Sequence, residues 1–217
     1  MKLIDCENCE VRIISDQAQR RAPMGSGWSG SAEDAENDEA LYYAAAHGDA
    51  DHVAALIEAA ANVNHRQKDH ELATPLMAAA EEGAVDCVEA LVQCSSCDVS
   101  IADRWGLTAC HYAAMRGNAS CLTLIIQAGA PLEQQTQDGA TPAHLAAEHG
   151  HADCLALLLD AGIDPGRRSK AGICVADAAS GSDACLAVLA ARSDGQPGPF
   201  DVDMLREVER VPLMATV

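Results

Sequence analysis

The chain has 217 residues, of which 49% are apolar, but it contains only three Tyr, two Trp and one Phe. It carries 14 Lys and Arg against 33 Asp and Glu, which gives a formal charge of −19. Because nucleic-acid phosphates and anionic membrane surfaces are bound by clustered basic side chains, this balance argues against both kinds of partner. No stretch approaches the roughly 20 apolar residues that span a bilayer, and residues 1–15 lack the apolar run of a secretory signal.

The sequence begins with a segment that has no repeated apolar pattern. After Ala22 it is rich in Ser, Gly and acidic residues, and residues 31–39 contain five carboxylates. A segment with few apolar side chains and a high net charge cannot bury enough surface to fold on its own. We therefore predict that residues 1–37 form a flexible acidic N-terminal segment.

An apolar pattern of helical spacing then recurs along the chain. Apolar pairs four residues apart mark a helix with one buried face. They occur in five groups: His52/Val53/Leu56/Ile57, Cys87/Val88/Leu91/Val92, Cys121/Leu122/Ile125/Ile126, Cys154/Leu155/Leu158/Leu159 and Cys185/Leu186/Leu189/Ala190. Successive groups begin 35, 34, 33 and 31 residues apart. This periodicity indicates stacked units that each bury an apolar face against a neighbour.

A shorter, alanine-rich segment precedes each of these groups. Its centre is an Ala pair in every unit, at Ala44-Ala45, Ala79-Ala80, Ala113-Ala114, Ala146-Ala147 and Ala178-Ala179. A glycine closes the first four segments, at Gly48, Gly83, Gly117 and Gly150. Glycine ends helices because it adopts the left-handed conformation without a steric penalty. Each unit is therefore predicted to be a short helix, a Gly turn, a longer helix and a polar loop.

The clearest unit, residues 138–151, has the sequence Asp-Gly-Ala-Thr-Pro-Ala-His-Leu-Ala-Ala-Glu-His-Gly-His, and partial copies lie at residues 106–114 and 72–80. These units resemble ankyrin repeats, which have about 33 residues and a Thr-Pro-Leu-His-x-Ala motif. The resemblance covers residues 38–194. It implies an all-α solenoid of about five repeats, with hairpin-like loops, here called fingers, between successive units.

The resemblance also assigns structural roles within the motif. Thr is expected to cap the first helix of a unit, and Pro at the first helical position sacrifices no hydrogen bond. His111 and His144 are expected to bond back towards this Thr and towards the neighbouring finger, whereas Met77 and Asp177 are expected to break the arrangement. We interpret the first and fifth units as caps of the ankyrin-repeat domain, residues 38–194.

The segment after the repeats has a different composition. It opens with Gly195-Gln196-Pro197-Gly198-Pro199, which is typical of a linker. Apolar residues at helical spacing follow, from Phe200 to Val208. We predict a linker and a short C-terminal helix in residues 195–217.

Ten cysteines raise the alternative of a thiol-based zinc-binding or redox protein. Two Cys-x-x-Cys pairs occur, Cys6/Cys9 and Cys94/Cys97, but they are 85 residues or more apart, unlike the ligands of a compact zinc ribbon. Buried stripe positions account for Cys87, Cys121, Cys154 and Cys185, because a free Cys packs as a small apolar residue. We expect no metal and no cofactor, and a reducing compartment, the cytoplasm or the nucleus.

No catalytic motif stands out in the sequence. It lacks a nucleophile elbow, a phosphate-binding loop and a metal-hydrolase helix. The resemblance instead implies a non-catalytic, monomeric module that recognises another protein as an adaptor, scaffold or inhibitor. Ankyrin arrays bind partners on the concave face formed by fingers and inner helices.

Trp105 is the leading candidate for partner contact, because it lies in a finger at a position that the motif leaves free. Trp and Arg are enriched among the residues that dominate binding energy, and Arg104 and Arg116 provide a cationic spot suited to an acidic or mixed partner. An alternative is that Trp105 only stacks on the next finger. The predicted partner-binding residues are Arg104, Trp105, Met115, Arg116, Gln137, Asp138, Glu148 and His149.

Overall fold

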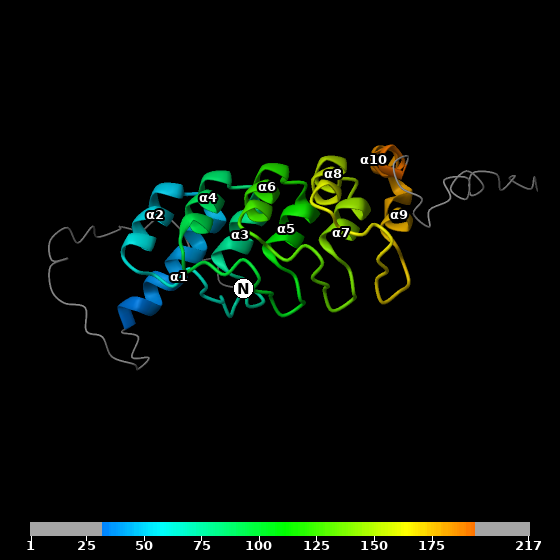
Figure 1. Cartoon of the computed structure of the whole chain (residues 1–217). Helices are drawn as coiled ribbons and strands as arrows, with labels where there is room; N and C mark the ends of the chain where they lie inside the picture. The colour runs from blue at the N-terminus through cyan, green and yellow to red at the C-terminus, as the bar shows by residue number, and fades with distance from the viewer. Residues whose placement is uncertain (1–31, 194–217) are drawn as a thin grey trace, which may run out of the picture. The chain divides into compact units, whose positions relative to one another are not determined.

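The computed structural model describes residues 32–193, and their side chains from 36 to 191. Within this range the chain forms α-helices and one short 3-10 segment, which lie in two rows (Figure 1). The inner row consists of α1 (Ala32–His47), α3 (Pro75–Glu82), α5 (Ala109–Arg116), α7 (Pro142–Glu148) and α9 (Val175–Ala178), followed by η2 (Ala179–Gly181). The outer row consists of α2 (Ala50–Glu58), α4 (Val85–Gln93), α6 (Ala119–Gln127), α8 (Ala152–Asp160) and α10 (Asp183–Ser193).

Each helix packs against the helix at the same place in the next unit. Inner helices contact one another in series, and outer helices do the same. The two helices of each of the first four units also pack together, and in the fifth unit α10 packs against η2. The fingers extend from the inner helices on the side away from the outer row (Figure 1). The predicted all-α stack of helical pairs is confirmed.

The first helix begins before the boundary predicted between residues 37 and 38. Helix α1 begins at Ala32, so residues 32–37 are helical. Their acidic composition led to the prediction of a flexible segment, although negative charge at the beginning of a helix is favourable. Residues 1–31 and 194–217, which include the expected C-terminal helix, lie outside the described range.

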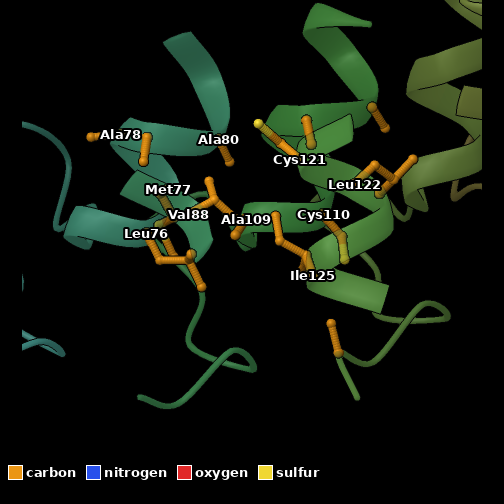
Figure 2. Packing of buried hydrophobic residues seen from close by; sticks show 14 of the residues in the cluster. Leu76, Met77, Ala78, Ala80, Val88, Ala109, Cys110, Cys121, Leu122 and Ile125 are labelled. Carbon is orange, nitrogen blue, oxygen red and sulfur yellow. The ribbon is translucent and has the colours of Figure 1, made fainter. Parts of the chain in front are cut away.

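The apolar stripes form one continuous core between the two rows. Cys87, Cys121, Cys154 and Cys185 are fully buried, as are Leu91 and Leu158. Figure 2 shows the side chains of α3, α4, α5 and α6 meeting between the helices, with Val88, Ala109, Cys121 and Ile125 among them. Alanine on the inner helices permits this close approach, because Ala79, Ala80, Ala113 and Ala114 are almost completely buried.

Threonine begins the inner helices α3, α5 and α7, as predicted. Thr74, Thr108 and Thr141 have extended backbone conformations and are followed by helix, with Pro at the first position of α3 and α7. The other end of α5 is closed by Gly117, with φ of +78°. A Cβ atom there would lie 2.5 Å from Nδ1 of His151 in the next unit, so glycine is required by both conformation and space.

The motif histidines connect each inner helix to the next finger. Thr108 donates its backbone N–H to Nδ1 of His111 over 3.1 Å, and Nε2 of His111 donates to the Ala140 carbonyl over 3.4 Å. His144 makes the equivalent pair of bonds with Thr141, at 3.2 Å, and with the Ile173 carbonyl, at 3.1 Å. The expected role of both histidines is confirmed.

Met77 and Asp177 were expected to break the motif. This was wrong for the hydrogen bond that the motif histidine accepts from the backbone N–H of the helix-capping residue. Thr74 donates its N–H to the Met77 sulfur over 3.4 Å, and Cys174 donates its N–H to Oδ2 of Asp177 over 3.1 Å. A thioether and a carboxylate can both accept the hydrogen bond that the imidazole accepts elsewhere. The cap therefore survives the change of residue type.

Candidate partner-binding surface

A backbone hydrogen bond joins each finger to the finger of the preceding unit. Arg104 donates its N–H to the Glu71 carbonyl over 2.9 Å, and Gln137 donates to the Trp105 carbonyl over 2.8 Å. Lys170 donates to the Asp138 carbonyl over 3.0 Å. The finger tips therefore form a continuous ladder whose spacing is set by the helices beneath them.

Trp105 is held firmly at its backbone, while its side chain reaches solvent. Oδ1 of the buried Asp103 accepts the N–H groups of Trp105 and Leu107, each over 2.8 Å. The indole remains 49% exposed, and the guanidinium of Arg104 lies 5.0 Å from its ring centroid. Because its backbone is already fixed, ordering Trp105 on binding costs mainly the freedom of its two side-chain torsions.

Tyr112 connects the fingers to the far end of the inner helices. Its hydroxyl donates to Oδ2 of Asp103 in the finger over 2.9 Å. Arg116 lies one helical turn beyond Tyr112 on the same face of α5. Leu145 and His149 hold the corresponding positions on α7. Finger tips, half-buried Tyr112 and Leu145, and the ends of the inner helices thus form one surface, called here the finger-side surface.

The eight predicted residues fall on two parts of this surface. Arg104, Trp105, Gln137 and Asp138 are exposed in the third and fourth fingers. The other four lie at the ends of α5 and α7, where Arg116, Glu148 and His149 are exposed and Met115 is half-buried. Gln137 also donates its side-chain N–H to the Arg104 carbonyl over 2.5 Å, which holds the two fingers together.

The two arginines are paired with carboxylates of the preceding unit. Nη1 of Arg104 lies 2.7 Å from Oε2 of Glu71, and Nη2 of Arg116 lies 2.6 Å from Oε1 of Glu81. Each guanidinium charge is therefore balanced within the array. The cationic spot expected around Trp105 is largely neutralised by these pairs.

Besides Val85 on the outer helix α4, two exposed apolar side chains were missed by the sequence interpretation. Tyr43 on α1 is 39% exposed and Ile173 beside the fifth finger is 44% exposed. Tyr43 stands five residues before Gly48, as Tyr112 stands before Gly117, and Ile173 follows its finger as Leu107 follows the third. The equivalent residues Tyr112 and Leu107 are half-buried, so the repeat pattern gave no signal that Tyr43 and Ile173 would be exposed.

The thiols of the second Cys-x-x-Cys pair lie in the loop after α4. Burial, helped by the neighbouring Cys94 and Asp98, raises the pKa of the Cys97 thiol to about 11. Metal binding and thiol exchange both need the thiolate, so this environment disfavours them. Cys6 and Cys9 lie outside the described residues. Within the described range, no three His, Cys, Asp or Glu side chains converge as a metal site would require.

The repeat architecture agrees with a comparison to known families. A sequence profile for ankyrin repeats, in three copies, matches residues 24–103 and 76–169, which together make up more than half of the chain. The chain belongs to the ankyrin-repeat family. Ankyrin repeats generally mediate protein–protein interaction. None of the described helices of this ankyrin-repeat protein has the length and apolar content needed to cross a bilayer.

Proposed function

We propose that this ankyrin-repeat protein is a non-catalytic module that binds another protein across the finger-side surface, centred on Trp105. One observation carries the proposal: the indole is half exposed although its backbone is fixed by Asp103 and by the ladder to Gln137. Trp is enriched among the residues that dominate the binding energy of interfaces. The function as adaptor, scaffold or inhibitor follows from the family and is part of the proposal.

The proposal extends to the state and location of the protein. Six of the eight described cysteines are buried, where they pack as small apolar side chains. This use of cysteine favours a reducing compartment, so we propose that the protein resides in the cytoplasm or nucleus. We also propose that it is a monomer and needs no cofactor. The net charge of −19 disfavours nucleic acid and anionic membrane as partners.

The test is a comparison of two variants that remove exposed apolar side chains of similar accessibility. Trp105→Ala should weaken binding to the partner identified by affinity purification by about 2 kcal/mol or more, as expected for a dominant interface residue. Val85→Ala is the control, because Val85 is 38% exposed on the outer helix α4. Binding is measured by calorimetry.

Thermal unfolding of both variants separates binding from folding. The midpoint of Trp105→Ala should stay close to that of the unmodified chain, because the indole is half exposed. A variant that binds normally but unfolds at a much lower temperature would make Trp105 a packing residue between fingers. The finger-side surface would then be centred elsewhere.

A further inference from the structure

Several carboxylates at the centre of the finger-side surface take part in no ion pair with the described residues. Glu82, Asp138 and Glu148 are exposed, and within residues 36–191 none of these carboxylates has an ion-pair partner. Arg104 and Arg116, which lie among them, are already paired with Glu71 and Glu81.

Further cations lie at or near this region. Lys68 and Arg66 lie in the second finger, and Arg66 donates to the Ala102 carbonyl over 2.9 Å. Lys170 of the fifth finger is exposed and donates its backbone N–H to the Asp138 carbonyl. The formal charge of −19 over the whole chain adds a long-range field of the same sign as the central carboxylates. A partner with positive charge would therefore be attracted to the centre of the surface.

Aromatic faces accompany these carboxylates. Arg104 shows the geometry in which a guanidinium approaches the Trp105 ring, and about half of the indole remains accessible. Half-buried Tyr112 and Met115 continue the surface along α5. A cationic side chain gains from an aromatic face and from a nearby carboxylate together, because both place negative potential at the same position.

A second aromatic group lies at the N-terminal end of the inner row. Tyr43 approaches His70 of the second finger edge-on, with ring centroids 5.9 Å apart, and Tyr42 stacks on His70 at 5.0 Å. The Glu39 carboxylate lies beside them, 3.1 Å from Nε2 of Gln67. The combination of exposed aromatic ring and carboxylate thus occurs twice, once around Trp105 of the third finger and once at Tyr43 of α1.

We propose that the partner presents a basic segment, with Lys or Arg interspersed among apolar residues, to the finger-side surface. This inference rests on the proposed function and specifies the chemistry of its ligand. The apolar residues would contact Trp105 and Met115, while the cations would lie between Glu82, Asp138 and Glu148. An acidic segment would have to displace the internal ion pairs of Arg104 and Arg116 before it could be neutralised.

The probe is a library of random peptides displayed on phage and selected on the purified full chain. We expect the enriched peptides to carry net positive charge together with apolar residues. Replacing each Arg of a selected peptide by citrulline, which keeps the shape and removes the charge, should weaken binding by about tenfold or more.

Two triple variants locate the interaction. Glu82→Gln, Asp138→Asn and Glu148→Gln together should weaken binding of the selected peptide by about tenfold or more at physiological salt. Asp86→Asn, Glu89→Gln and Asp153→Asn remove the same charge from the outer helices α4 and α8 and should change binding less than about twofold. Thermal midpoints of both variants verify that they are folded.

The possible results decide between the alternatives. If the two triple variants weaken binding equally, the net charge of the chain and not the carboxylates of the finger-side surface is responsible. This result would overturn the proposal. Selection of neutral or acidic peptides, or of none, would overturn it as well. The proposed function would survive these results if Trp105→Ala still abolished binding of the partner, whereas an unaffected Trp105→Ala variant would contradict the proposed function itself.

Discussion

Leu91 and Leu158 occupy the same position in α4 and α8, and both are completely buried. Leu189 holds this position in α10, but it is only half-buried, because no further outer helix within the described range covers it. The same Leu→Ala substitution can therefore be compared at two buried sites and one half-buried site that occupy equivalent positions.

We predict that Leu91→Ala and Leu158→Ala each lower the free energy of unfolding by about 2–5 kcal/mol, the usual cost of emptying a buried leucine site. Leu189→Ala should cost less, because its side chain already contacts solvent. Urea unfolding of the three variants measures this order. A cost below about 0.5 kcal/mol for Leu158→Ala would mean that its stripe is not part of the core.

The geometry that the inner helices and fingers repeat from unit to unit could be predicted from the sequence. The charge of the surface could not be predicted from local motifs alone. Thr, Pro and the Nδ1 atom of His act within one unit, so their spacing revealed the caps. The ion pairs of Arg104 and Arg116 join residues that are one repeat apart in sequence and adjacent in space. Only the superposition of successive units would have predicted them.

Exposure at equivalent positions was also beyond a motif-by-motif interpretation. Ala78 and Tyr43 hold the same place on α3 and α1, yet Ala78 is buried and Tyr43 is 39% exposed. The larger side chain extends past its neighbours and meets His70 of the following finger. Whether such a residue is accessible depends on the finger opposite, which for the second unit is longer than in the third and fourth units.

At the scale of the helix and its finger, His111 makes the structure sensitive to acid. Burial lowers the pKa of His111 to about 4, although hydrogen bonds to the Ala140 and Gln134 carbonyls partly oppose this. An unfolded chain would titrate this group near 6.5. Between these pH values the unfolded state binds more protons, so stability is complete above about pH 6.5 and falls as the pH drops towards 4.

We predict that His111→Gln flattens this pH dependence, removing about 1 kcal/mol of the loss between pH 7 and pH 5.5. Burial also lowers the pKa of His144, so the double variant with His144→Gln should be flatter still. The measurement is the free energy of unfolding in urea at several pH values. Equal slopes for the unmodified chain and His111→Gln would show that His111 is not buried in its neutral form.

Across the described part of the molecule, stability is shared between units because the inner helices and the outer helices each pack in series. Side chains also cross from one unit to the next. Asn118, just after Gly117, donates to the Ala80 and Glu81 carbonyls at the end of α3, both over 2.9 Å. Nε2 of His151 donates to the Met115 carbonyl over 3.0 Å at the end of α5. The inner helices α3 and α5 are therefore each completed by a residue of the following unit.

This dependence predicts that the array unfolds in one transition. In a Trp28→Phe background, fluorescence reports the surroundings of Trp105 in the third finger, whereas far-ultraviolet circular dichroism reports all helices. The two signals should give the same urea midpoint, because loss of one unit exposes the apolar faces of both neighbours. Destabilising the fourth unit with Leu158→Ala should shift both midpoints together. A fluorescence midpoint that stays fixed while the dichroism shifts would show that the third and fourth units fold independently, despite the ladder and the buried stripe that join them.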